Sequence, residues 1–392
     1  MTFIAHLVLL ALAVPAAAAS LYLLVFTLLS AALPRVLSSS RRLRFDVIVP
    51  AHDEAAVIEA AVASLRKIDW PAESFRILVV ADNCSDATAA LARAAGADVI
   101  ERFDPELRGK GYALALGFQH SQARKWADAV VVVDADTQVS ANLLEAFAAR
   151  IEAGAKAVQA HYGVSNPHAS WRTRLMTIAM ASFHRVRSRA RERLQLSCGL
   201  RGNGWCVTHR LLRQVPYKAY SLAEDVEYGI DLGLAGYRVH YADEAHVAGI
   251  MVSGEQASRT QRQRWEDGRV QLIRTRVVPL LKAATGPDGG VCLDLALDLL
   301  VLPLSYVAAN VALLIMLAGL GTLAAPSLEP WLWLGLACAA SLAFYVLRGW
   351  SLSGVGLRGL VDLLRAPFFV IWKLLSMLRP HNSAEWVRTK RE

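Results

Sequence analysis

The chain has 392 residues, of which 55% are hydrophobic and 19% are charged, and its mean hydropathy is +0.33. It is too apolar for a wholly soluble enzyme and too charged for a protein embedded in a membrane throughout, so we expect a soluble domain with membrane-spanning ends.

The net charge is +8, and the basic residues cluster beside apolar stretches, which favours membrane lipids over nucleic acid as the partner. The five cysteines are widely spaced without a C-x-x-C pair, which favours a reducing cytosol and predicts neither a zinc site nor a disulfide framework.

Residues 3–33 form an almost continuous apolar run that is long enough to cross a bilayer. A cleaved signal peptide is the alternative, because residues 16–20 are small. No basic residue precedes the run, whereas several follow it at 35–44. By the positive-inside rule, we predict a retained anchor over residues 1–34 with the following chain in the cytosol.

From Phe45 onward, short apolar runs alternate with helical spacing. We predict strands at 45–50, 75–81, 97–101, 129–133 and 155–164, and helices at 54–66, 87–95 and 110–126. This alternation implies right-handed crossovers and a mostly parallel α/β sheet. Neither a dinucleotide fingerprint nor a P-loop is present, so we expect a nucleotide to be held by carboxylates and a cation.

The run Val130–Val133 predicts a strand buried on both faces, and it ends abruptly at Asp134 and Asp136. Ligands bind at the carboxyl ends of strands in open α/β sheets, where these carboxylates could hold a divalent cation against substrate phosphates. A solvated turn is the alternative. The stretch 108–111, Arg-Gly-Lys-Gly, precedes a helix and suits a diphosphate, although a helix-start turn explains it equally well.

Three later stretches also carry functional chemistry. The loop from Gly199 to Trp205 is rich in glycine, which lets backbone approach a ligand closely. Glu224 and Asp225 open a predicted helix, where the macrodipole alone favours acids and a general base near the cation site is the functional interpretation. The segment 261–265, Gln-Arg-Gln-Arg-Trp, could clamp a diphosphate and stack on a sugar, or anchor the chain at the membrane interface.

The remaining stretches concern the membrane. Residues 171–194 are apolar first and basic later, which fits either an amphipathic helix on the membrane or an exposed helix. Residues 292–325 and 331–348 predict two further spans. Asp294 and Asp298 could form a functional intramembrane pair, but we expect them to mark the water-exposed end of the first of these two spans.

The expected organisation is an anchor over 1–34, a cytosolic catalytic domain over 35–285, two spans within 286–350, and an interfacial helix and cytosolic tail over 351–392.

Several short motifs occur in a characteristic order: Val49-Pro-Ala-His-Asp-Glu54, Asp82-Asn-Cys-Ser-Asp86, Arg108-Gly-Lys-Gly111, Asp134-Ala-Asp136, Glu224-Asp225 and Gln261-Arg-Gln-Arg-Trp265. Together they resemble the family 2 glycosyltransferases, and more narrowly the membrane-bound branch that includes cellulose, hyaluronan, chitin and poly-N-acetylglucosamine synthases. The resemblance covers about residues 45–270. Its most specific part is the Q-x-x-R-W element flanked by membrane spans.

This resemblance implies a GT-A fold with a Rossmann-like sheet, a UDP-sugar donor, inversion at the anomeric carbon, and Mg²⁺ or Mn²⁺ as cofactor. It implies nucleotide contacts by Pro50, Glu54 and Asp82, a diphosphate contact by Lys110, and metal binding by Asp136 assisted by Asp134. It also implies a general base at Asp225, and a border to the acceptor and the leaving UDP made by Glu224, Gln261, Arg264 and Trp265.

The resemblance leaves the acceptor open. The Q-x-x-R-W element favours processive extension of a glycan, whereas three spans favour a single addition to a lipid-linked acceptor, unless an oligomer or an accessory secretion subunit completes a channel. A membrane nucleotidyltransferase and a non-catalytic scaffold are the less favoured alternatives. In each case we expect an integral protein of the inner cell membrane.

Overall fold

The computed structural model describes residues 2–34, 36, 38–251, 255–287 and 289–367, and the side chains of residues 255–265 lie outside this description. The chain separates into two compact units. The larger unit contains residues 32–167 and 191–296. The smaller unit contains residues 2–31, 168–190 and the described residues from 297 onward.

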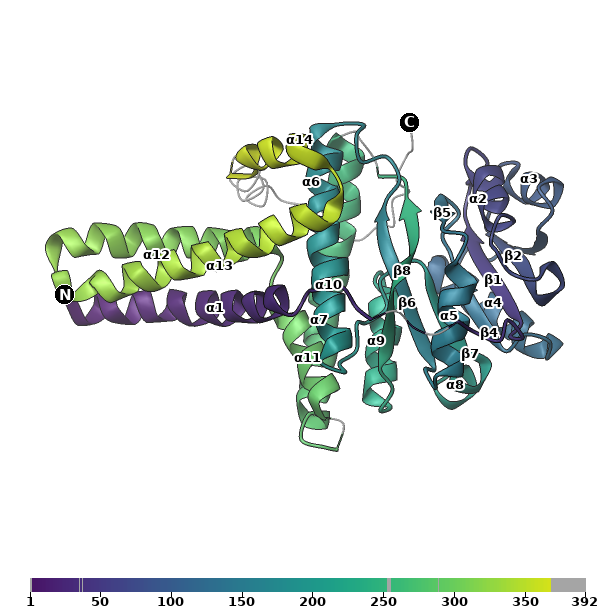
Figure 1. Ribbon diagram of the computed structural model, residues 1–392, viewed down its shortest axis with the longest axis horizontal. Coiled ribbons are helices and arrows are strands. Elements are labelled where there is room, and N and C mark those ends of the chain that lie inside the picture. Colours follow the sequence, from purple (N-terminus) through teal and green to yellow (C-terminus); the bar gives the residue numbers. More distant parts are fainter. Residues whose placement is uncertain (1, 35, 37, 252–254, 288, 368–392) are drawn as a thin grey trace. The chain divides into compact units, whose positions relative to one another are not determined.

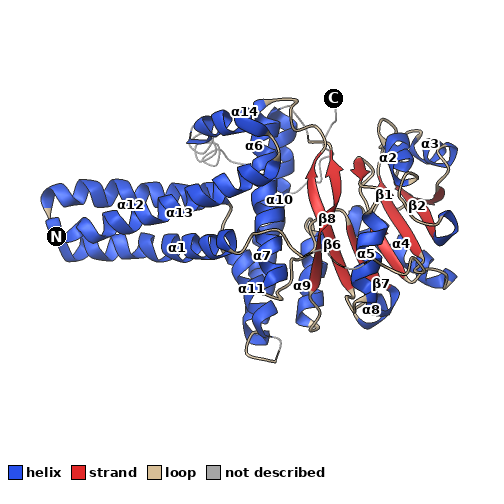
Figure 2. Ribbon diagram, in the orientation of Figure 1, coloured by secondary structure: helices blue, strands red, loops and turns tan. Residues whose placement is uncertain are grey.

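The larger unit is built on an eight-stranded sheet in the order β3-β2-β1-β4-β7-β6-β8-β5 (Figure 2). Its strands are β1 (Phe45–Ala51), β2 (Phe75–Asp82), β3 (Asp98–Arg102), β4 (Ala129–Val132), β5 (Thr137–Val139), β6 (Ala157–Val164), β7 (Trp205–Thr208) and β8 (Val239–Gly249). The pairs β1–β2, β1–β4, β2–β3 and β6–β8 are parallel, whereas β7 is antiparallel to both of its neighbours and β5 is antiparallel to β8. The expected mostly parallel α/β sheet is therefore confirmed, with antiparallel strands that the sequence did not predict.

Helices flank this sheet (Figure 1). In the larger unit they are α2 (Ile58–Leu65), η1 (Ala72–Ser74), α3 (Thr88–Ala94), α4 (Lys110–Arg124), α5 (Leu143–Glu152), α8 (His209–Gln214), α9 (Glu224–Leu234) and α10 (Glu255–Ala283). Two elements, α7 (Arg187–Arg193) and α11 (Gly289–Leu300), have residues in both units. Side chains alternate between the faces of a strand, so Val131 packs in the core with α2 and α5, and Val130 and Val132 pack in the core with α4 and α9. The expectation that this strand is buried on both faces is confirmed.

The smaller unit contains three helices that are long and apolar enough to cross a membrane. Its elements are α1 (Thr2–Leu28), α6 (Trp171–Met180), the π-helical η2 (Ala181–Val186), α12 (Leu304–Ala324), η3 (Pro326–Leu328), α13 (Glu329–Ser353), α14 (Gly356–Asp362) and η4 (Leu363–Arg365). Helices α1, α12 and α13 lie side by side and share a buried cluster that includes Leu23, Leu314 and Leu342 (Figure 1). The segment just after α1 is joined to the last turns of α13, where the Arg348 guanidinium donates to the Ser30 hydroxyl at 2.8 Å and to the Ser30 carbonyl at 2.9 Å.

The two further apolar helices expected after the catalytic domain are present, but the first begins at Leu304 rather than at residue 292. The preceding helix, α11, ends at Leu300 and a new one begins after Pro303, because proline lacks the N–H that a continuing helix needs. Asp294 and Asp298 therefore lie on α11 rather than on a membrane-length helix.

These two acids do not mark a water-exposed end either. Within the larger unit, Asp294 accepts from Arg191 at 2.7 Å, and within the smaller unit Asp298 accepts from Arg187 at 3.1 Å. Arg191 is fully buried and Arg187 is nearly so. A buried charge needs a partner, so the two acids neutralise arginines of the basic stretch. Of the two alternatives for residues 171–194, the exposed helix is therefore wrong.

A buried polar network fixes the start of β1 against its neighbours. Asp46 is 1% exposed and accepts from Arg76 of β2 at 2.8 and 2.9 Å, and it also accepts from Ser121 of α4. The Ser121 hydroxyl in turn lies 3.0 Å from His209 Nε2 at the start of α8. One carboxylate thus connects two strands and two helices.

We expect Asp46→Asn to reduce the free energy of unfolding by about 3 kcal/mol, because it leaves the Arg76 guanidinium without its charge partner in a largely buried site. The measurement is guanidinium chloride unfolding followed by tryptophan fluorescence. Glu101→Gln is the control, because Glu101 pairs with Arg93 at 2.6 Å while both side chains are over half exposed, and it should cost less than about 1 kcal/mol. Equal losses in the two variants would contradict the assignment.

Candidate active site

The carboxyl ends of β1, β2 and β4 bring several predicted residues to one edge of the sheet (Figure 1). Pro50 lies in β1 and Glu54 in the loop that follows, while Asp82 is the last residue of the neighbouring β2. His52 Nδ1 lies 2.7 Å from the Asp82 carbonyl and so links the two loops. The structure therefore brings together the three residues expected to contact the nucleotide.

Asp82 is held in place by the next strand. Its Oδ1 accepts from the Arg102 guanidinium at 2.6 Å, and Asn83 donates to the same oxygen at 3.2 Å. Asp82 is 5% exposed, so the ion pair offsets the cost of burying its charge. Its orientation is fixed before any ligand binds.

Lys110 lies among the acids of the site. Its ammonium is 2.6 Å from Asp134 Oδ1 and 3.5 Å from Glu224 Oε1, and it donates to the Gly202 carbonyl at 2.6 Å. Burial alone would lower the pKa of Lys110, but the carboxylates of Asp134 and Glu224 outweigh burial and raise it. Lys110 therefore stays charged and offers a fixed cation beside the carboxylates.

Glu224 and Asp225 occupy the first turn of α9, as the sequence predicted. Burial raises the pKa of Glu224 to about 7, even though Lys110 opposes the rise. Burial also raises the pKa of Asp225, while Lys110 and the backbone N–H of Val226 lower it. A carboxylate with a raised pKa is a better proton acceptor than an exposed one, and this applies to both Glu224 and Asp225.

Tight packing fixes α4 relative to the segment that leads into α9. A Cβ at Gly111 would lie 2.4 Å from the Ala219 carbonyl oxygen, so only glycine allows this approach. The rings of Tyr112 and Tyr220 stack with centroids 4.5 Å apart. The lysine at the start of α4 and the acids at the start of α9 are therefore held as one rigid group.

Asp134 and Asp136 follow β4 on one turn, and their donor set fits a divalent cation. Carboxylate oxygens are the ligands that Mg²⁺ and Mn²⁺ prefer. Burial raises the pKa of the Tyr162 phenol, and the negative charges of Asp134 and Asp136 raise it further. Sequence reasoning missed Tyr162, which no local pattern distinguishes, and Asn203, which contacts this turn and whose position between two glycines was a usable signal.

A second group with metal-type ligands consists of Asp53, Cys84 and Asp86, whose ligand atoms lie within 4.8 Å of one another. Its carboxylates already join two loops, since Asp53 accepts from the Ser85 N–H at 2.6 Å and Asp86 from the Ala55 N–H at 3.1 Å. Burial raises the pKa of the Cys84 thiol, which disfavours the thiolate that a metal needs. We interpret this group as a structural link.

The predicted residues Gln261, Arg264 and Trp265 lie in α10, where their side chains are outside the described residues. The described part of α10 is attached to α9, because Arg276 pairs with Glu227 at 2.9 Å and with Asp231 at 3.0 Å. The helix that carries the Q-x-x-R-W element is therefore anchored on the helix that carries Asp225.

Comparison with known proteins gives a family and a fold. The family described as "Glycosyltransferase like family 2" matches residues 43–268. Among curated relatives, a probable glucomannan 4-beta-mannosyltransferase of Arabidopsis thaliana is 23% identical over 251 residues, covering 60% of this chain and 46% of that protein. A probable glycosyltransferase of Bacillus subtilis (strain 168) is 24% identical over 249 residues, covering 59% of this chain and 56% of that protein. The chain thus spans about half the length of these relatives.

A solved structure supports the fold independently. The mannosyltransferase from Pyrobaculum calidifontis in complex with GDP-Man and Mn²⁺ aligns with a TM-score of 0.54 at 20% identity, over 86% of this chain and 98% of that one. At this identity, the likeness establishes the fold alone. The expected GT-A architecture is confirmed.

We expect Lys110→Met to lower the thermal unfolding midpoint, and to lower it more at pH 8.5 than at pH 6. The pKa of Glu224, about 7, lies above its value in the unfolded chain, so stability is lost as pH rises through that value. Without the ammonium, ionising this buried carboxyl costs more. Unfolding is followed by circular dichroism in EDTA.

The double variant Lys110→Met/Glu224→Gln is the control, because it has no glutamate to ionise and should lose less of its stability at high pH. If Lys110→Met lost the same amount at both pH values, Lys110 would not be the group that offsets the charge of Glu224.

Proposed function

Because the chain belongs to glycosyltransferase family 2 and is a transferase of sugars, we propose that it moves a hexose or N-acetylhexosamine from a nucleotide-diphosphate sugar to a glycan or lipid-linked acceptor, with inversion. The observation that carries this proposal is the convergence of Asp134, Lys110, Glu224 and Asp225 at the carboxyl edge of the sheet. Carboxylates and a fixed cation at that edge suit diphosphate departure and acceptor deprotonation.

In the proposed reaction, Asp225 accepts the proton of the acceptor hydroxyl as that oxygen attacks the anomeric carbon. Its raised pKa supports this role. The Lys110 ammonium offsets the charge that develops on the leaving diphosphate. A single displacement inverts the anomeric carbon and needs no covalent intermediate on the protein.

Asp136, assisted by Asp134, would hold Mg²⁺ or Mn²⁺, which when bound supplies positive charge against the diphosphate. Pro50, Glu54 and Asp82 would contact the base and ribose of the nucleotide. Gln261, Arg264 and Trp265 would border the acceptor and the leaving nucleotide.

The motif resemblance supports a UDP-sugar as the donor, and GDP-mannose is the alternative. The alternative has two observations in its support: relatives include a glucomannan 4-beta-mannosyltransferase, and a solved structure of the same fold is a mannosyltransferase in complex with GDP-Man. The acceptor is a growing polysaccharide or, in the non-processive alternative, a single lipid-linked molecule.

The three apolar helices support an integral membrane protein. We place it in the inner cell membrane with its catalytic unit in the cytosol, where nucleotide sugars are made, because basic residues follow the first and last apolar helices. An oligomer or an accessory secretion subunit would complete a channel if the product is a long polymer.

We expect the purified, detergent-solubilised protein to release the nucleoside diphosphate from one member of a panel of UDP- and GDP-sugars when an acceptor is present. Asp225→Asn should reduce the rate by about 10²- to 10⁴-fold, because it removes the proton acceptor. Asp136→Ala and EDTA should each reduce it as well. Asp98→Asn is the control, since Asp98 is an exposed acid on β3 and should leave the rate unchanged.

The anomeric outcome provides a separate test. Proton NMR of the early product should give the configuration opposite to that of the donor. Retention of configuration would rule out the proposed single displacement, and full activity in Asp225→Asn would rule out Asp225 as the base.

A further inference from the structure

The turn that carries Asp134 and Asp136 is held at both ends by one side chain. The Asn203 Oδ1 accepts from the backbone N–H of Asp134 at 3.0 Å, and its Nδ2 donates to the Thr137 hydroxyl at 2.6 Å. The Thr137 hydroxyl in turn donates to Asp136 Oδ1 at 3.2 Å. A chain of hydrogen bonds therefore runs from Asn203 to the second carboxylate.

An amide is the side-chain group that this position requires. The Asp134 N–H needs an acceptor, and the Thr137 hydroxyl needs a donor because its own hydrogen is directed to Asp136. A carboxylate supplies no donor and adds negative charge beside two acids, whereas a hydroxyl lacks two separate atoms to span the turn. Asparagine meets both needs without charge.

Asn203 is itself immobilised. Asn203 is 0% exposed, and its backbone carbonyl accepts from the side-chain amide of Gln159 at 2.7 Å. The next residue, Gly204, donates to the Val132 carbonyl of β4 at 2.9 Å. A Cβ at Gly204 would lie 2.4 Å from Val247, so only glycine allows the loop this close to β8.

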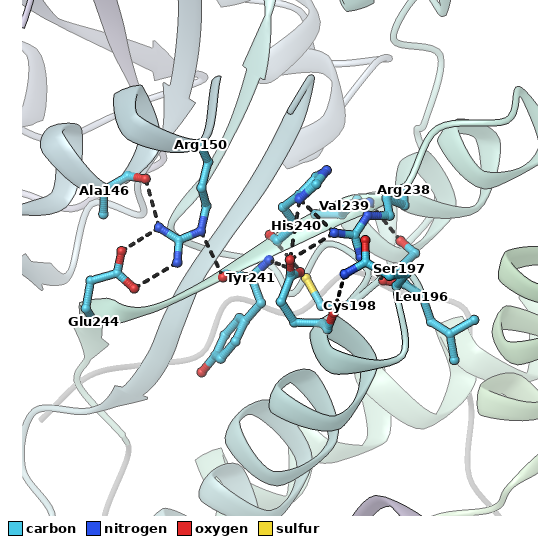
Figure 3. A network of polar contacts seen from close by, with 12 residues as sticks. Ala146, Arg150, Leu196, Ser197, Cys198, Arg238, Val239, His240, Tyr241 and Glu244 are labelled. Atoms are coloured by element: carbon cyan, nitrogen blue, oxygen red, sulfur yellow. Dashed lines mark hydrogen bonds and ion pairs between the residues drawn. The ribbon is translucent and has the colours of Figure 1, made fainter. Parts of the chain in front are cut away.

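The loop that carries Asn203, residues 197–204, is also anchored to β8 at its beginning. The backbone N–H of Val239 donates to the Ser197 hydroxyl at 3.0 Å, and the backbone N–H of Cys198 donates to the Val239 carbonyl at 3.0 Å (Figure 3). Figure 3 also shows Arg150 of α5, which donates to the Tyr241 carbonyl at 3.0 Å and pairs with Glu244, holding β8 from the other side. The loop is therefore a rigid support.

This loop also contacts the other charges of the site. The Gly202 carbonyl accepts from Lys110, and a Cβ placed on Gly202 would lie 3.7 Å from Asp225 Oδ2. One rigid segment thus sets the positions of the carboxylate turn and the lysine, and passes beside the proposed base.

We propose that Asn203 is a positioning residue that orients the Asp134–Asp136 turn for divalent-cation binding, acting through the Thr137 hydroxyl. This inference rests on the proposed function, because it assumes that the turn binds a cation. Groups that orient metal ligands usually contribute 10- to 100-fold to metal affinity or activity.

The test is Mn²⁺ binding to the full-length, detergent-solubilised protein, measured by electron paramagnetic resonance without donor or acceptor. Asn203→Ala and Thr137→Val should each weaken Mn²⁺ binding by about 10- to 100-fold. Their effects should not add in the double variant, because both break the same chain of hydrogen bonds. Thr137→Ser, which keeps the hydroxyl, should bind like the wild type.

A second readout separates positioning from general damage. At saturating Mn²⁺, sugar transfer by Asn203→Ala should recover toward the wild-type rate, whereas transfer by Asp136→Ala should not. Asn142→Ala is the control, because Asn142 is a half-buried asparagine that donates to the Glu244 carbonyl at 3.0 Å, and the Mn²⁺ affinity of this variant should not change.

The outcomes are distinguishable. Wild-type Mn²⁺ affinity in a folded Asn203→Ala would overturn the proposal for Asn203 while leaving the proposed transferase intact. If Asn203→Ala fails to fold, unchanged affinity in Thr137→Val would overturn it. A wild type that transfers sugar without binding Mn²⁺ would overturn the cation role of the turn, and a wild type that does neither would overturn the proposed function.

Discussion

The charge balance at the edge of the sheet depends first on the ammonium group of Lys110. Glu224 and Asp225 are carboxyls whose pKa values are raised by burial, and Asp134 adds a further negative charge. Lys110 lies 2.6 Å from Asp134 and 3.5 Å from Glu224, so its charge offsets part of the cost of ionising them. The close contact between α4 and the segment before α9 holds the Lys110 ammonium beside these carboxylates.

The sheet supplies the frame on which these charges are held. Because side chains alternate along β4, neighbouring valines contribute to separate cores, and helices can cover both faces. The strand then leaves the core at Asp134, where polar groups first reach the edge. The buried pair of Asp46 and Arg76 connects β1 and β2 well before their carboxyl ends, so the site is built on strands whose register is already fixed.

The elements that the sequence predicted are those with strong local patterns. The valine run predicts a buried strand, and the acids at 224 and 225 predict the start of α9. The short β7 lacks such a pattern, because its four residues are ordered by pairing with strands distant in the chain. Pro303 is a signal for the helix break before it, but proline alone does not decide, because Pro15 lies within α1 and Pro279 within α10.

In the site, too, the sequence predicted the residues that a local pattern marks. Motif residues were found because short patterns mark them, whereas Asn203 acts through a contact with Asp134, 69 residues away, that no local pattern encodes. The partners of Asp294 and Asp298 were missed for this reason too, since their arginines lie over a hundred residues earlier in the chain. Long-range contacts decide which polar residues are buried, and composition alone does not contain them.

The contact between Arg348 and Ser30 has a consequence for how the apolar helices fit a bilayer. Helix α1 is apolar over its 27 residues, about 40 Å at 1.5 Å per residue, whereas a hydrocarbon core is about 30 Å thick. The apolar part of α13 lies between Glu329 and Arg348, over residues 330–347, and is about 27 Å long at the same rise. Because Arg348 is hydrogen-bonded to Ser30, just beyond α1, any tilt or extension into the headgroups that accommodates the excess length of α1 also involves α13.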